Sequence, residues 1–227
     1  MQAVSAIRTQ IVKRLLRAAC KPSDYPSLAR LGSEYGGWTI PGDLLHPGGV
    51  CYSAGSGEDM SFDMDLVSRY GCEVFAIDPT PRALQYMAKV AANVPQVHLV
   101  PLGLWSSSRR MRFYAPKNRL HVSHSITNLQ RTRDYFEADC TTVSELMVRN
   151  GHRHLDLLKL DIEGAEYEVL RNVIETELRI RILCVEFDQP SPVQRMIGMV
   201  RQLSQTGYEL VAIEAFNFTF LQSKISD

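Results

Sequence analysis

The sequence predicts an α/β fold in which a mostly parallel sheet is covered by helices on both faces. Apolar strand-like segments and helix-like segments alternate at least five times between residues 50 and 205. The strand-like segments are short, nearly continuous apolar runs, which is typical of parallel strands buried on both faces. The last two apolar segments flank Ala215 and can pair as an antiparallel hairpin. This C-terminal hairpin favours a seven-stranded sheet in which one strand runs antiparallel to the others.

The N-terminal residues 1–47 are expected to lie outside this domain, which we assign to residues 48–227. Residues 4–20 carry apolar side chains at helical spacing, and two prolines end that helix. The stretch 21–49 is rich in Pro and Gly and is interpreted as a lead-in segment.

Within the domain, capping residues mark the ends of the predicted helices. Thr142 is expected to cap a helix with Glu145 as its capping-box partner, and Gly207 ends the last helix. We expect strands over residues 50–54, 73–77, 97–100, 111–114, 136–141, 155–160, 180–187, 208–214 and 216–221, and helices over residues 62–70, 82–92, 143–149, 165–177 and 193–205.

The charge balance argues against a strongly charged partner for the chain as a whole. Lys and Arg together number 25, as do Asp and Glu, so no long-range attraction to nucleic acid or anionic lipid is expected. The first 30 residues are an exception, because they carry six basic residues and one acid, Asp24. This basic helix could contact a membrane surface or an anionic substrate, although docking on its own domain is the simpler interpretation.

The five cysteines are far apart and show no C-x-x-C pairing, so we expect packed, reduced thiols and neither disulfides nor a zinc site. No apolar run approaches the length of a membrane span, and basic residues interrupt the first 20 residues, where a signal peptide needs an apolar core. These observations predict a cytoplasmic protein with no transmembrane segment.

A glycine turn, Ser53-Ala54-Gly55-Ser56-Gly57, follows the first strand of the domain. Its two glycines would let the backbone turn tightly and approach a ligand. Met60 stands where a dinucleotide fingerprint has its third glycine. Glu58 and Asp59 would repel a pyrophosphate but tolerate the ammonium of an amino-acid moiety. The turn therefore favours S-adenosylmethionine over NAD, although a purely structural turn is the alternative.

Asp78 closes the second strand, 23 residues beyond Gly55. In such sheets ligands bind at the carboxyl ends of the strands, and a carboxylate at this spacing can accept hydrogen bonds from two ribose hydroxyls. We expect Asp78 to hold a ribose; the alternative is a helix N-terminal acid before Pro79.

A third strand end reads Leu160-Asp161-Ile162-Glu163-Gly164-Ala165-Glu166. Asp161 is expected to project into the crevice, and Lys159, on the same side of the strand, to pair with a carboxylate there. Glu166 would lie one turn into the next helix, as an acid that complements the helix dipole.

Together these segments resemble the FkbM-type S-adenosylmethionine-dependent methyltransferases over residues 48–214. The strongest match covers residues 156–170, and the segments 141–146, 77–79 and 185–187 are similar to neighbouring segments of the family. The family usually has Asp-x-Gly-Ala-Asn-x-Gly at the first strand end, and this chain departs from it at Ser53, Ser56 and Glu58.

The resemblance implies a Rossmann-like sheet, S-adenosyl-L-methionine as cofactor, and methyl transfer to an oxygen of a small-molecule, saccharide or lipid-like acceptor. In-line displacement needs acceptor and methyl group held at near-attack distance, and a base only if the hydroxyl must lose its proton. The catalytic candidates are Asp161, Glu163 and His124, and His121 lies in the same polar loop as His124. The cofactor-binding candidates are Ser53, Gly55, Ser56, Gly57, Asp78, Pro79, Gly103 and Asp161.

Residues near these motifs offer two further possible roles. Asp161, Glu186 and Asp188 could hold Mg²⁺ through oxygens, but we expect no metal, and Glu186 would then orient backbone or pair with a neighbouring cation. Tyr35 and Trp38 could cover a sulfonium cation with their aromatic faces, although packing beneath the N-terminal helix is the simpler interpretation.

Two competing functions stay open. An NAD(P)-dependent Rossmann oxidoreductase would need a third glycine after Gly57 and a parallel C-terminal end, and the sequence offers neither. A catalytically inactive methyltransferase-like binding module is the other, because the first motif is altered. A homodimer and a peripheral membrane contact of the N-terminal helix are left open, and nucleic acid is not expected as a partner.

Overall fold

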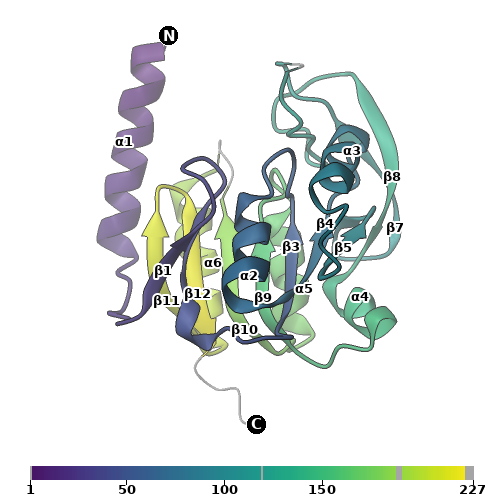
Figure 1. Ribbon diagram of the computed structural model, residues 1–227. Helices are drawn as coiled ribbons and strands as arrows, with labels where there is room; N and C mark the ends of the chain where they lie inside the picture. Colours follow the sequence, from purple (N-terminus) through teal and green to yellow (C-terminus); the bar gives the residue numbers. More distant parts are fainter. Residues whose placement is uncertain (1, 119, 188–190, 223–227) are drawn as a thin grey trace.

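The computed structural model describes residues 2–118, 120–187 and 191–222, and a seven-stranded mixed sheet forms its centre (Figure 1). The strand order is β11-β12-β10-β9-β3-β4-β5. In this sheet β12 pairs antiparallel with both β10 and β11, whereas the other pairings are parallel. The strands are β3 (Val50–Ala54), β4 (Glu73–Ile77), β5 (Val97–Val100), β9 (Leu155–Leu160), β10 (Ile180–Glu186), β11 (Tyr208–Glu214) and β12 (Asn217–Gln222).

The chain reverses its course across the sheet at β3. From β3 it moves outward through β4 to β5, and it later returns to pair β9 with the other side of β3. The carboxyl ends of β3, β4 and β9 therefore meet at a topological switch point, where open α/β sheets bind their ligands.

Helices cover both faces of the sheet because the strand side chains alternate between two apolar layers. Leu157 and Ile182 pack in one layer with α2 (Ser61–Tyr70), and α3 (Pro81–Val90) extends that side over β4 and β5. Their neighbours Leu158 and Leu183 pack in the opposite layer. That layer also contains side chains of α4 (Val143–Asn150), α5 (Glu166–Glu175) and α6 (Val193–Gln205).

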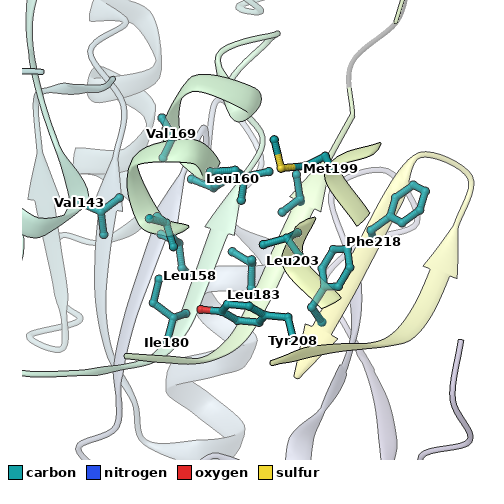
Figure 2. Close-up of a cluster of buried hydrophobic side chains, with 14 of the residues drawn as sticks. Val143, Leu158, Leu160, Val169, Ile180, Leu183, Met199, Leu203, Tyr208 and Phe218 are labelled. Atoms are coloured by element: carbon teal, nitrogen blue, oxygen red, sulfur yellow. The ribbon is translucent and has the colours of Figure 1, made fainter. Parts of the chain in front are cut away.

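Figure 2 shows the larger of these layers, in which side chains of β9 and β10 interlock with those of α5 and α6. Leu158, Leu183 and Leu203 are completely buried. Removing one such side chain from water contributes about 2 kcal/mol to folding. This layer therefore holds the strands in the register that the ligand-binding edge requires.

The predicted alternation of strands and helices is confirmed. The strands predicted over 73–77, 97–100 and 155–160 and the helix predicted over 193–205 match the observed bounds. Thr142 caps α4 as expected, because its Oγ1 accepts the backbone N–H of Glu145 at 3.1 Å.

The structure adds elements that the sequence analysis did not predict in the stretch 21–49. A hairpin of β1 (Leu28–Leu31) and β2 (Trp38–Pro41) is followed by a short 3-10 helix, η1 (Gly42–Leu44), where only a lead-in segment was expected. Trp38 and Ile40 are buried in the same layer as α2. The hairpin thus covers a part of the sheet face that a helix would otherwise cover.

Three further strands form a separate sheet beside β5, in the order β6 (Gly103–Leu104), β8 (Tyr135–Thr141) and β7 (Arg109–Tyr114). The sequence predicted two of these strands in part, over 111–114 and 136–141, but not that they pair with each other. The chain between β7 and β8, residues 115–134, is called the cap loop below.

The remaining helix, α1 (Gln2–Ala19), lies along one edge of the molecule (Figure 1). None of the helices in the described ranges combines the length and apolar character needed to cross a bilayer. All five cysteines are buried free thiols, as the sequence analysis expected.

Candidate functional site

A cavity of about 730 Å³ lies at the carboxyl edge of the sheet, at the switch point formed by β3, β4 and β9. The glycine turn, the end of β4, the end of β9 and the end of β10 form its floor and walls. Part of the cap loop and Tyr35 of the β1–β2 connection close it from above. A volume of this size accommodates a nucleoside-sized ligand together with part of a second molecule.

The glycine turn is shaped by its contact with the end of β9. Gly55 has φ of +79°, and a Cβ at this position would lie 1.7 Å from the carbonyl oxygen of Asp161. Only glycine fits here, since both the positive φ and the close approach exclude a side chain. The glycine turn therefore has a structural role, which was the alternative interpretation. The same turn also brings its backbone to the cavity.

Asp78 is held by the same turn. Its carboxylate accepts the backbone N–H of Gly57 at 3.1 Å and that of Thr80 at 2.8 Å. Burial raises the pKa of Asp78 above its usual value, and the N–H donors of Thr80 and Gly57 partly offset this effect. The side chain is fixed at the end of β4, with its carboxylate on the cavity wall.

Lys159 joins the ends of β3 and β9 beneath the cavity. Its buried ammonium donates to the carbonyl oxygen of Gly55 and to the carboxylate of Asp161, each at 3.2 Å. Burial alone would lower the pKa of Lys159, but the nearby carboxylates of Asp161 and Asp63 outweigh burial and raise that pKa. The predicted pairing of Lys159 with a carboxylate is confirmed.

Glu186, the last residue of β10, shares the cavity floor with Asp161. Burial, the negative charge of Asp161 and a hydrogen bond with it raise the pKa of Glu186 to about 8. Glu186 is therefore protonated at neutral pH and donates to Asp161. The carboxylate of Asp161 thus lies between an ammonium donor and a carboxylic acid donor.

The loop after β9 is organised by Glu166. This side chain is completely buried, and its Oε1 accepts the backbone N–H groups of Ile162 at 2.8 Å and Gly164 at 3.2 Å. Glu163, between them, has φ of +54°, a conformation that a residue other than glycine adopts only when its surroundings impose it. Glu166 therefore does more than complement the helix dipole, because it fixes the loop that carries Glu163.

The cap loop is attached to the loop after β9. The hydroxyl of Ser125 donates to the carbonyl oxygen of Glu163 at 2.6 Å. A Cβ at Gly164 would lie 2.5 Å from Oγ1 of Thr127, so the two loops are in close contact. Nδ1 of His124 lies 2.9 Å from the carbonyl oxygen of Val122. An Nδ1–H tautomer satisfies that carbonyl and leaves Nε2 as a proton acceptor.

Tyr35 overhangs the cavity on a tightly tethered turn. The hydroxyl of Ser33 donates to Asp59 at 2.5 Å, and the backbone N–H of Ser33 donates to Ser61 at 2.7 Å. Tyr35 is 84% exposed, whereas Trp38 is 1% exposed and lies in the apolar layer. Tyr35 and Trp38 were the two aromatic residues that could cover a sulfonium cation. Of these two, only Tyr35 lines the cavity.

The structure brings the predicted site residues together, with one difference. The cavity is lined by Gly55, Ser56, Gly57, Asp78, Pro79, Gly103, His124, Asp161 and Glu163. Ser53 is not among the lining residues; it is completely buried, with its Oγ 3.4 Å from that of Ser56.

The sequence did not predict that Asp63 lies near Lys159, or that Glu186 lines the cavity and hydrogen-bonds Asp161. Asp63 lies in α2, where helical periodicity gives no reason to place an acid near Lys159. Asp188, the third ligand of the metal alternative, lies outside the described residues. Among the residues that are described, no three His, Cys, Asp or Glu side chains are grouped so that they could hold a metal ion.

Comparison with known proteins gives a family and a set of similar folds. A family model described as Methyltransferase FkbM domain matches residues 51–210. No curated protein sequence matches the chain.

Among solved structures, the fibrillarin of Aeropyrum pernix with natively bound S-adenosyl-L-methionine aligns with a TM-score of 0.43 and 11% identity, over 77% of this chain and 66% of that chain. A METTL16 MTase domain aligns with a TM-score of 0.49 and 11% identity, over 96% and 79% of the two chains. A TehB-like SAM-dependent methyltransferase from Corynebacterium glutamicum aligns with a TM-score of 0.41 and 14% identity, over 98% and 100%. The chain thus spans just under two thirds of the fibrillarin.

Proposed function

The chain belongs to the family of methyltransferases with an FkbM domain, and from this premise we propose that it transfers a methyl group from S-adenosyl-L-methionine to a hydroxyl oxygen. The acceptor would be a small molecule, a saccharide or a lipid-like molecule. The observation that carries the proposal is that Asp78, the glycine turn and Asp161 line one cavity at the switch point of the sheet.

The residues around this cavity suit the proposed cofactor. The buried carboxylate of Asp78 can accept both ribose hydroxyls, and Gly57 leaves backbone accessible beside it. Among the described residues that line the cavity, Lys159 is the one ammonium or guanidinium group. The lining carboxyl groups are those of Glu58, Asp59, Asp78, Asp161, Glu163 and Glu186.

Such an acidic lining favours a sulfonium and an ammonium over a pyrophosphate. The pyrophosphate of a dinucleotide would face several carboxylates and one buried lysine, which already has Asp161 as its partner. The charges around the cavity therefore support S-adenosylmethionine against NAD(P). We assign residues 48–227 as the cofactor-binding domain, to which the β1–β2 connection adds Tyr35.

We assign the proton transfer to Asp161. When bound, the cofactor would supply an electrophilic methyl group, and its sulfur would keep the electron pair of the S–C bond that breaks as the C–O bond to the acceptor forms. Asp161 would take the hydroxyl proton, because its carboxylate lines the cavity and Lys159 fixes its position there. Glu163 and His124 are the alternative bases, and both also line the cavity.

A methyl-transfer screen tests this proposal. The protein is incubated with methyl-tritiated S-adenosylmethionine and fractionated cell extract, and the labelled product is analysed by mass spectrometry and NMR. The proposal requires that a compound from one fraction carries the tritiated methyl group on an oxygen. This labelling should be lost when Asp78→Ala replaces the wild-type protein. Label on nitrogen or carbon would reject O-methylation. Tight cofactor binding with no transfer to any fraction would instead identify a binding module without turnover.

A further inference from the structure

Helix α1 attaches to the domain by one side of its C-terminal half. Leu16 is completely buried and Cys20, just after the helix, is 4% exposed; both belong to the apolar layer that contains α6. The ammonium of Lys13 lies 5.5 Å from the ring centroid of Phe216. Figure 1 shows that the N-terminal end of α1 extends clear of the sheet. The opposite side of the helix is consequently left outside the fold.

That outer side carries apolar residues. Ile11 is 53% exposed and Leu15 is 51% exposed, and their spacing of four residues places them one above the other on the helix. Ala18, in the next turn, is also exposed. Single exposed apolar side chains are ordinary, but a pair aligned along a helix that projects from the domain forms a stripe.

The same helix is strongly basic. Residues 1–23 contain no Asp or Glu, and Arg14 and Arg17 are exposed beside the apolar stripe. A second cavity, of about 420 Å³, lies where α1 ends against α6. Its charged side chains are those of Lys21, Arg201 and Glu209, and Ser23, Ser204 and Tyr208 add hydroxyl groups. Because the whole chain has zero net charge, the remainder beyond residue 23 is net negative.

We propose that α1 and the adjoining basic cleft form a docking surface for an anionic lipid membrane. Ile11 and Leu15 enter the interface between headgroups and acyl chains, while Arg14, Arg17 and the cleft residues Lys21 and Arg201 hold lipid phosphates. A second copy of the chain fits this surface poorly, because two such helices would bring like charges together. Nucleic acid would use the cations but would leave the apolar stripe in water.

Vesicle co-sedimentation of the full chain tests this proposal. Phosphatidylcholine vesicles with phosphatidylglycerol should retain the protein, and vesicles of phosphatidylcholine alone should not. The paired change Arg14→Gln with Arg17→Gln should weaken binding about fivefold for each charge removed. Ile11→Ser with Leu15→Ser should abolish it, and added salt should weaken binding of the wild type.

A matched control uses α4, where Val148 is 80% exposed and Arg149 is also exposed. Val148→Ser with Arg149→Gln should leave vesicle binding unchanged, and circular dichroism should show all variants folded. Equal binding to both vesicle types, or binding unaffected by both α1 variants, would overturn the proposal. It would also be overturned if the α1 variants abolished self-association or retention on RNA while vesicle binding persisted.

Discussion

The ammonium of Lys159 donates to the carbonyl oxygen of Gly55 across 3.2 Å and so joins the end of β9 to the glycine turn after β3. The same ammonium is paired with Asp161 at 3.2 Å, and it is buried. One lysine therefore holds together the two strand ends between which the candidate site lies.

Removing the charge of Lys159 is expected to destabilise the fold. Lys159→Met should lower the free energy of unfolding by about 3 kcal/mol, because the carboxylates of Asp161 and Asp63 would be left without their cation in a buried setting. Urea denaturation measures this change. Lys89→Met, at an exposed position in α3, should change the free energy by less than about 0.5 kcal/mol. Equal effects of the two substitutions would refute the structural role of Lys159.

Gly55→Ala should disrupt the site, because the added Cβ would lie 1.7 Å from the carbonyl oxygen of Asp161. We expect a loss of about 3 kcal/mol or more in the free energy of unfolding, together with loss of cofactor binding. Gly48→Ala provides the control, since Gly48 also has a positive φ of +77° but no heavy atom within 4 Å of the added Cβ. That substitution should cost about 1 kcal/mol and leave binding intact.

The stability of the protein should depend on pH through Glu186. In the unfolded chain this carboxyl ionises near 4.5, whereas in the folded protein its pKa is about 8. Between these values the folded state holds the additional proton, so the stabilising contribution is complete below pH 4.5 and is lost as pH rises through 8.

Glu186→Gln removes this titration and keeps a donor for Asp161. The free energy of unfolding of the variant, relative to wild type, should therefore increase by about 5 kcal/mol from the acidic to the alkaline end of that window. Urea denaturation at a series of pH values gives the two curves. Glu175→Gln, exposed at the end of α5, is the control. Parallel curves for wild type and Glu186→Gln would show that the raised pKa is wrong.

The three candidate bases can be separated by kinetics once an acceptor is known. Asp161→Asn should lower kcat by about 10²–10⁴ with little change in the Kd for the cofactor, whereas Glu163→Gln and His124→Ala should retain most of the activity. The pH profile of each variant should be compared with that of the wild type. If His124→Ala alone removed the acidic limb of the profile, where a general base becomes protonated, the base would be His124 and not Asp161.

The fold was largely predictable because its signals are local. The apolar runs at 73–77 and 155–160, the cap at Thr142 and the acids at the strand ends each depend on a few neighbouring residues. Asp78 and Asp161 could be placed on one edge of the sheet for the same reason, since parallel strands end on one side.

The rest depends on contacts between distant parts of the chain. The hydrogen bond between Glu186 and Asp161 depends on the register of β10 against β9, which their sequences do not specify. The hairpin that carries Tyr35 was missed because Gly and Pro obscure its short strands, and its stability comes from the burial of Trp38 against the sheet. Ser53 is completely buried beside Ser56 and does not line the cavity, although the adjoining turn does, and its short side chain gave no sign of this in the sequence.

Isothermal titration calorimetry with S-adenosylmethionine and NADH tests the central claim most directly. The account predicts a clear binding heat for S-adenosylmethionine and none for NADH. It also predicts at least about tenfold weaker S-adenosylmethionine binding by Asp78→Ala, which loses charge-assisted hydrogen bonds worth about 1.5–3 kcal/mol each. Tight NADH binding without any heat from S-adenosylmethionine, or full S-adenosylmethionine affinity in Asp78→Ala, would contradict it.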